Sequence, residues 1–173
     1  MHTTTRRRQL PIRVARATGS GPTGLAAFDA SLRSAGAANY NLVRLSSVIP
    51  PASLVGEVSA PIQVDGERGD RLYTVYAEWR ASEPGQEAWA GVGWLQDPLT
   101  GRGVLVEHEG NVEATVRADI TSSLGALRAG RQDVDFGPDH VVVQGATCRD
   151  EPVCALVIAV FEHETWRRDE VVG

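Results

Sequence analysis

Several features that define other classes of protein are scarce in this sequence of 173 residues. It has two cysteines, which are too few for a disulfide framework or for a zinc site without converging histidines. No stretch approaches the roughly 20 apolar residues of a membrane helix, and no apolar run of the length that a signal peptide needs follows the basic residues near the start of the sequence. The 17 basic and 22 acidic side chains leave a net charge of -5, so the overall electrostatic potential of the chain does not favour binding to nucleic acid. We therefore expect a cytoplasmic protein that binds neither membrane nor nucleic acid.

The two cysteines flank a turn-like segment, residues 149–152, that separates two apolar runs. Cys148 and Cys154 could therefore face each other across a hairpin. Because nothing in the sequence indicates an oxidising compartment, free and buried thiols are the favoured interpretation.

The length and the 42% hydrophobic content are typical of a single domain over residues 1–173 with its own core. The only basic cluster, Arg6 to Arg8, lies in a polar terminal segment. We expect residues 1–10 to form a flexible, solvated tail.

Two segments have the apolar spacing of helices. The first runs from a predicted N-cap at Thr23 to Gly36, and the second from a predicted N-cap at Asn111 to Gly130. Their apolar faces comprise Leu25, Phe28 and Leu32 in the first helix, and Val112, Val116, Ile120, Leu124 and Leu127 in the second.

The segments rich in β-branched and aliphatic residues are expected to be strands. They are residues 12–18, 40–51, 72–80, 87–96, 103–109, 141–148 and 153–162. The polar residues 58–69 are expected to form a surface connection. This order predicts an α+β fold, an αββα-type sandwich in which two main helices pack on antiparallel or mixed sheets.

Two adjacent serines interrupt the extended segment 40–51. Ser46 and Ser47 lie among apolar residues, and Pro50 and Pro51 end the strand just after them. Because a buried hydroxyl needs a hydrogen-bond partner, such a pair fills a core poorly. The ordinary alternative is a strand end at which the serines meet solvent or backbone.

A second polar group ends a later strand. Glu107 and Glu109 alternate with His108, so the two carboxylates share one face of the strand and the imidazole takes the other. The same divergence of neighbouring side chains argues against a metal site here or at residues 162–164. A polar strand end is the structural alternative.

The run Leu-Ala-Ala-Phe-Asp-Ala-Ser-Leu, residues 25–32, is followed by Ala-Asn-Tyr-Asn-Leu-Val-Arg-Leu-Ser-Ser-Val-Ile-Pro-Pro, residues 38–51. Together they resemble the N-terminal part of the pyruvoyl-dependent arginine decarboxylase family, and the likeness continues more weakly through residues 106–110. The resemblance implies self-cleavage between Ser46 and Ser47 into a short chain, residues 1–46, and a long chain, residues 47–173. Ser47 then becomes a covalent pyruvoyl cofactor, and neither pyridoxal phosphate nor a metal is needed.

The resemblance also implies roles for other side chains. Glu107 supplies a proton after decarboxylation, with Glu109 kept as a second candidate, and Asn41 holds the pyruvoyl group and the substrate. Asn41 precedes Ser47 by six residues and shares its face if the strand is regular. Its alternative is an edge-strand residue bonded to backbone.

The substrate contacts implied by the family lie on the first helix and on the extended segment after it. Asp29 faces the substrate guanidinium, for which a carboxylate is the matching group, although it could be a solvent-facing helical residue. Leu25 and Val48 line the substrate methylenes or, alternatively, belong to the core. Tyr40 departs from the family pattern, in which smaller or aliphatic residues stand, and it could shorten the pocket or redirect it to another amine.

The expected activity is decarboxylation of L-arginine to agmatine and carbon dioxide by a trimer, or a hexamer made of two trimers, of cleaved protomers, a reaction that would suit polyamine biosynthesis. One alternative is the same chemistry on another amino acid. The other is a homologue that does not process itself and serves as a binding or partner subunit.

Overall fold

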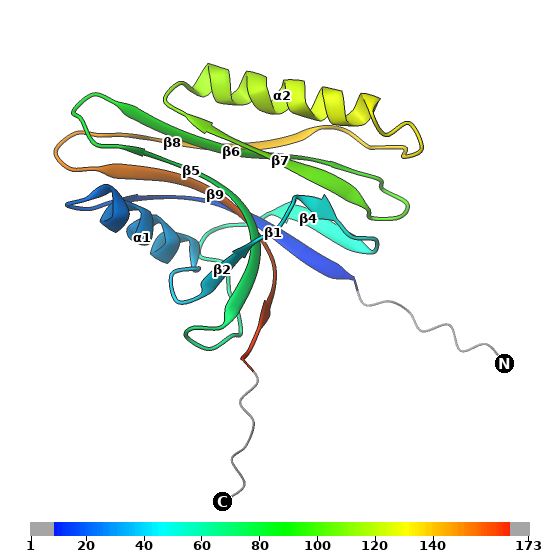
Figure 1. Ribbon diagram of the computed structural model, residues 1–173, viewed down its shortest axis with the longest axis horizontal. Coiled ribbons are helices and arrows are strands. Elements are labelled where there is room, and N and C mark those ends of the chain that lie inside the picture. The colour runs from blue at the N-terminus through cyan, green and yellow to red at the C-terminus, as the bar shows by residue number, and fades with distance from the viewer. Residues whose placement is uncertain (1–8, 167–173) are drawn as a thin grey trace, which may run out of the picture.

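The computed structural model describes residues 9–166 and arranges them in four stacked layers (Figure 1). Helix α1 covers one face of a five-stranded sheet, a four-stranded sheet packs on its other face, and α2 covers the outside of the second sheet. The predicted αββα sandwich is therefore confirmed. The elements in chain order are β1 (Leu10–Ser20), α1 (Gly24–Ala35), β2 (Asn41–Arg44), β3 (Val48–Ile49), β4 (Ser53–Glu57), β5 (Arg71–Ala81), β6 (Glu87–Gln96), β7 (Gly103–Gly110), α2 (Glu113–Ala129), β8 (His140–Thr147) and β9 (Val153–Glu164).

The two sheets differ in how their strands pair. The five-stranded sheet has the order β2-β5-β9-β1-β4 and is mixed, because β1 pairs with β4 and β2 pairs with β5 in parallel. The four-stranded sheet has the order β3-β7-β6-β8 and is antiparallel throughout. The β2 and β3 strands, which are neighbours in sequence, thus lie at the edges of different sheets.

The side chains of the central strand β9 alternate between two hydrophobic cores. Ala155, Val157 and Ala159 face the second sheet, whereas Leu156 and Ile158 face α1. All five side chains are fully buried, which explains why this strand is continuously apolar rather than alternating.

Helix α1 begins and ends as predicted, and Phe28 and Leu32 of its predicted apolar face pack, partly buried, against the core. The Thr23 hydroxyl accepts a hydrogen bond from the Ala26 N–H at 3.1 Å, and Gly36 ends the helix with φ 85°, a conformation that favours glycine. The buried residues are Ala27, Ser31 and Ala35. The prediction that Leu25 belongs to the packed face is wrong, since its side chain is 69% exposed.

Helix α2 buries Val116, Ile120 and Leu124, as its spacing predicts. Its start differs from the prediction: Val112, not Asn111, is the N-cap, and no side chain caps it. Val112 is also 48% exposed rather than part of the apolar face. The turn from Gly110 brings the helix onto the sheet one residue later than the cap chemistry of asparagine indicates.

The close approach of α2 to the sheet depends on glycine in β6. A Cβ built at Gly93 would lie 2.4 Å from the Ile120 side chain and 3.1 Å from the His140 carbonyl oxygen. We therefore expect Gly93→Ala to lower the melting temperature by about 2 to 10 °C, since overpacking costs about 1 to 3 kcal/mol. Gly125→Ala is the matched control: Gly125 lies within α2 with open space around it, so this change should leave the melting temperature unchanged or raise it. Equal melting temperatures for the Gly93 variant and the parent would contradict this account of the packing.

The other strands match their predicted segments closely, with two exceptions. The short strand β4 was not predicted, and the segment 40–51 forms two strands instead of one. In addition, β1 begins at Leu10, which was assigned to the tail. Residues 1–8, with the arginine cluster, lie outside the described residues.

Both cysteines are free and buried, as predicted. They lie at the two ends of the connection between β8 and β9. Burial raises the pKa of the Cys154 thiol to about 11, so this group stays protonated at neutral pH.

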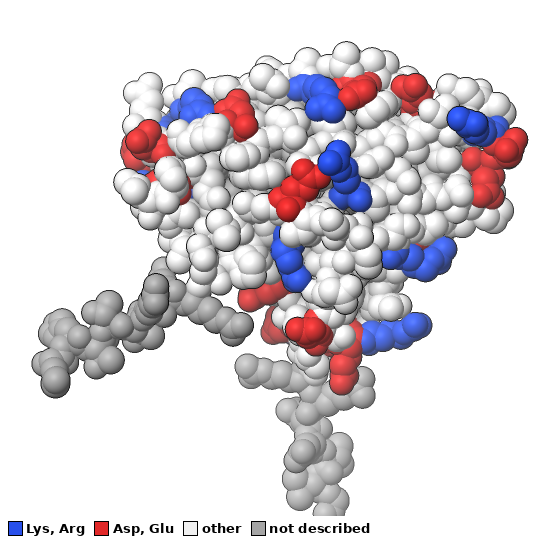
Figure 2. Space-filling model, turned by 180° about the vertical axis from the view of Figure 1, so that it is seen from behind, with Lys and Arg blue, Asp and Glu red and all other residues white. Residues whose placement is uncertain are grey.

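The surface carries basic and acidic side chains side by side. On the face shown in Figure 2 the two signs are interspersed. Ion pairs on the surface of the molecule include Arg16–Glu57 at 2.8 Å and Arg128–Asp139 at 2.5 Å. Among residues 9–166, neither helix is long and apolar enough to cross a membrane.

Candidate active site

The segment with the two serines passes from one sheet to the other. The strand β2 ends at Arg44 in the five-stranded sheet, and β3 begins at Val48 in the four-stranded sheet. On one side, the Leu45 N–H donates to the Thr74 carbonyl of β5 at 2.9 Å. On the other, the Ser47 carbonyl accepts from the Leu105 N–H of β7 at 2.8 Å. The Ser46–Ser47 peptide therefore lies between two backbone hydrogen bonds, one to each sheet.

Ser47 has a strained backbone at this crossing. Its φ is 66°, in the left-handed region that side-chain-bearing residues rarely adopt, at a typical cost of roughly 1–2 kcal/mol. Such strain persists only where the surroundings determine it, and here the hydrogen bonds to both sheets do so. A held and strained peptide is what self-cleavage requires.

The Ser47 side chain contacts the carboxylate of Glu107. The Ser47 hydroxyl lies 3.0 Å from Oε1 and 2.9 Å from Oε2 of Glu107, and both residues are half-buried. The two residues are 60 positions apart in sequence and meet because β3 and β7 are neighbours in the sheet. A carboxylate that accepts this hydrogen bond can also take the proton, which turns the hydroxyl into a nucleophile.

The neighbours of Glu107 on β7 diverge as the alternation predicts. His108 turns to the other face of the strand, where its Nε2 lies 2.8 Å from the hydroxyl of Ser123 on α2. Glu109 is exposed and makes no hydrogen bond with Ser47 among the described residues. Of the two candidate carboxylates, only Glu107 is thus brought to Ser47.

Asn41 is the first residue of β2 and is held by a neighbouring loop. Its backbone N–H donates to the Asp70 carbonyl at 2.8 Å, and its Nδ2 donates to the Gly69 carbonyl at 2.5 Å. The expectation of one regular strand from Asn41 to Ser47 is wrong, because β2 ends at Arg44. Asn41 makes no hydrogen bond with Ser47 within residues 9–166.

Asp29 lies on the exposed side of α1 and forms an ion pair with Arg33, one helical turn further on. Half of its side chain is accessible to solvent. No hydrogen bond or ion pair within the described part of the chain joins Asp29 to Ser47 or Glu107.

Leu25 and Val48 are both exposed, by 69% and 59%, so the alternative that they belong to the core is wrong. Tyr40, in contrast, is half-buried against the cluster between α1 and its sheet. Its hydroxyl donates to the carbonyls of Val64 and Gly66, each at 3.1 Å.

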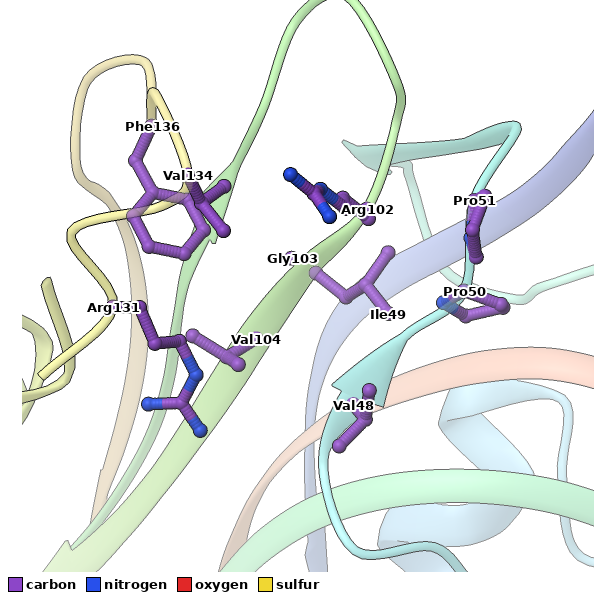
Figure 3. Close-up of a pocket in the computed structure, with 10 residues that line it drawn as sticks. All are labelled: Val48, Ile49, Pro50, Pro51, Arg102, Gly103, Val104, Arg131, Val134 and Phe136. Carbon is purple, nitrogen blue, oxygen red and sulfur yellow. The ribbon is translucent and has the colours of Figure 1, made fainter.

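An apolar pocket of about 310 Å³, which the sequence did not predict, lies beside Val48 (Figure 3). Val48 pairs with Val104, whose side chain belongs to the α2 side of the sheet, whereas Glu107 alternates to the opposite side. The pocket is therefore on the other face of β7 from the Ser47–Glu107 pair. No sequence pattern indicated it because β3, β7 and the loop after α2 assemble it. It is lined by Val48, Ile49, Pro50, Pro51, Arg102, Gly103, Val104, Arg131, Val134 and Phe136.

Comparison with known proteins identifies the family of this chain. The family model described as pyruvoyl-dependent arginine decarboxylase matches residues 11–165. Curated proteins of that name include one from Thermococcus sibiricus, 38% identical over 149 residues that cover 84% of this chain and 90% of the relative. Another, from Pyrococcus horikoshii, is 37% identical over 149 residues with the same coverage. A third, from Halobacterium salinarum, is 43% identical over 83 residues, and the match spans about half (51%) of that relative's length. This chain therefore belongs to the pyruvoyl-dependent arginine decarboxylase family.

Proposed function

We propose that this protein cleaves itself between Ser46 and Ser47, converts Ser47 into a pyruvoyl group and then decarboxylates L-arginine to agmatine and carbon dioxide. The observation that carries the proposal is the contact of the Ser47 hydroxyl with the Glu107 carboxylate, at 2.9 and 3.0 Å, on a backbone strained to a φ of 66°. The names of the relatives support arginine as the substrate.

Self-cleavage begins with the Ser47 hydroxyl. Glu107 takes its proton while the oxygen attacks the Ser46 carbonyl carbon, and the peptide bond is replaced by an ester as the Ser47 nitrogen leaves that carbon. Loss of the Ser47 α-proton then breaks the ester by β-elimination. Ser46 is released as a carboxylate, residue 47 becomes dehydroalanine, and water replaces its nitrogen as ammonia to give the pyruvoyl group.

The surroundings of residue 47 fit such a group. The Ser47 carbonyl, which survives the conversion, is bonded to the Leu105 N–H, and a carboxylate lies beside the side chain. These 173 residues contain no lysine, the residue that binds pyridoxal phosphate as a Schiff base. A carbonyl made from the chain itself is consistent with that composition. Bound in place, the pyruvoyl ketone supplies an electron sink for the bond that breaks as carbon dioxide leaves.

Two side chains act on the reacting end of the substrate. Glu107, next to residue 47, returns a proton to the former α-carbon after carbon dioxide has left. The Asn41 amide orients the substrate and the group at residue 47. In a single chain Asn41 bonds to Gly69 instead, so this role requires its unbonded amide oxygen to face the site.

A second copy of the chain completes the site at the guanidinium end. Asp29 lies on the exposed side of α1, as does Leu25 one turn before it, and within residues 9–166 no hydrogen bond or ion pair joins Asp29 to the Ser47–Glu107 pair. We therefore place active sites between protomers of a trimer, or of a hexamer of two trimers, in which exposed Leu25 covers the substrate methylenes. Val48 lies on the other face of β7 from the Ser47–Glu107 pair, so it contributes to the site of a neighbouring protomer. The Tyr40 hydroxyl is occupied by backbone carbonyls, which favours arginine over a substrate redirected by this residue.

The test of the substrate is carbon dioxide release from arginine, ornithine and lysine by the purified protein, combined with a change at Asp29. We expect release from arginine, and Asp29→Asn should raise the KM for arginine by about 10- to 100-fold. The reason is that a hydrogen bond to a charged group is typically worth about 1.5–3 kcal/mol. Self-cleavage of this variant, followed by mass spectrometry, should be unchanged.

Arg33→Gln is the matched control, because it removes the competing partner of Asp29 from the same helix face. It should leave the KM for arginine unchanged or lower it. Activity on ornithine or lysine but not on arginine, or an unchanged KM in the Asp29 variant, would refute the assignment of Asp29.

A further inference from the structure

The end of β9 contacts residues 67–70, the loop before β5 that holds Asn41. The residues Glu164, Thr165 and Trp166 are here called the C-terminal clamp. Trp166 Nε1 donates to the Gly69 carbonyl oxygen at 2.8 Å, and this oxygen also accepts from Asn41 Nδ2 at 2.5 Å. A carbonyl oxygen has two lone pairs, so both hydrogen bonds can be made together. One oxygen atom thus links Trp166 to Asn41.

The same loop is fixed by further contacts with the clamp. The buried carboxylate of Asp70 accepts from the Thr165 hydroxyl at 2.9 Å and from the Glu67 N–H at 2.8 Å. Arg71 lies over the Trp166 ring at 4.3 Å and pairs with Glu164 at 3.1 Å.

Gly69 itself has a restricted geometry. Its φ is 91°, and its N–H donates to the Asn39 carbonyl at 2.7 Å. The peptide that carries its carbonyl is also held by the Asp70 N–H, which donates to the Glu67 carbonyl at 3.1 Å, and the carbonyl oxygen itself accepts from the two side-chain donors. Without the indole N–H, the oxygen would keep Asn41 as its one side-chain donor among the described residues, and the amide plane of Asn41 would lose part of its restraint.

We propose that Trp166 is a positioning residue for Asn41 and acts through the Gly69 carbonyl oxygen. By fixing Nδ2 on that oxygen, it directs the amide oxygen Oδ1 of Asn41, which has no hydrogen-bond partner among the described residues, toward the reacting groups. The effect on turnover rests on the proposed function of Asn41, whereas the link between Trp166 and the amide does not.

The link is tested by the side-chain amide resonances of protein labelled with ¹⁵N-asparagine, since the sequence has only three asparagines, Asn39, Asn41 and Asn111. Trp166→Phe keeps a ring over Arg71 but removes the donor. It should shift the Asn41 amide pair and leave that of Asn111 unchanged. Trp79→Phe, at another exposed tryptophan, should leave the Asn41 pair unmoved. An unmoved Asn41 pair in the Trp166 variant would overturn the proposal.

The consequence for catalysis is tested with a double-mutant cycle. Trp166→Phe should lower kcat about two- to tenfold, the effect of one neutral hydrogen bond, with the KM for arginine unchanged. In an Asn41→Ala background the same change should cost less than about twofold, because the group that it positions is gone. An equal loss in both backgrounds would show that Trp166 does not act through Asn41. If the parent protein released no carbon dioxide from arginine, the proposed function would fail, and the amide resonances would still decide whether Trp166 positions Asn41.

Discussion

Ser47→Ala is expected to yield a single uncut chain with no decarboxylase activity. The change removes the hydroxyl that bonds Glu107 and that the proposed mechanism uses to attack the Ser46 carbonyl. Alanine keeps a Cβ on the strained backbone, so the fold itself should persist, with circular dichroism and assembly state like those of the parent. Denaturing mass spectrometry is the measurement: the parent gives fragments 1–46 and 47–173, the second with a carbonyl-bearing N-terminus, and the variant gives one mass.

Ser46→Ala is the matched control, since the mechanism uses only the carbonyl of that residue. Its side chain is exposed and makes no hydrogen bond within residues 9–166, so this variant should cleave and decarboxylate like the parent. Cleavage of Ser47→Ala at the same bond would contradict the role of the hydroxyl. An uncut parent would instead support the alternative of a non-processing partner subunit.

Much of the fold could be predicted because it depends on local patterns. The caps at Thr23 and Gly36 and the face of Val116, Ile120 and Leu124 are properties of short windows of sequence. The break between β2 and β3 is different. The segment is apolar and extended throughout, and only the partners offered by two separate sheets decide where the chain leaves one and joins the other.

The arrangement of the candidate site could be predicted only in part. The motif proposes Ser47 and Glu107, which the structure brings into contact, and alternation predicts that His108 faces away from Glu107, as its contact with Ser123 confirms. The exposure of Leu25 could not be predicted, because helical spacing does not distinguish a core residue from one that meets a second chain. The bond of Asn41 to Gly69 was also hidden, because it joins residues 28 positions apart through a backbone oxygen.

The second large effect is expected from Glu107→Gln, which separates the two steps that the residue serves. Glutamine retains an oxygen that can accept the hydrogen bond of Ser47, and water can take the proton slowly. Self-cleavage should therefore be slower than in the parent but reach completion on long incubation, as followed by mass spectrometry. Decarboxylation should fall by about 10²- to 10⁴-fold, since an amide cannot return a proton to the former α-carbon.

Glu109→Gln tests whether the rates of self-cleavage and decarboxylation depend on the position of the carboxylate on β7 or only on its negative charge. Glu109 is two residues further along the same strand and exposed, with no contact to Ser47 among the described residues, so both steps should proceed at parental rates. Equal losses in the two variants would mean that the net negative charge of the strand end, and not the contact at 2.9 Å, sets the rate. A Glu107→Gln variant that never cleaves would contradict the expectation that water can replace the carboxylate as the proton acceptor in self-cleavage. If Glu107→Gln were fully processed and turned over arginine at the parental rate, another group would have to donate the proton after decarboxylation. The hydrogen bond between Ser47 and Glu107, at 3.0 Å, would then serve only to hold the hydroxyl before self-cleavage.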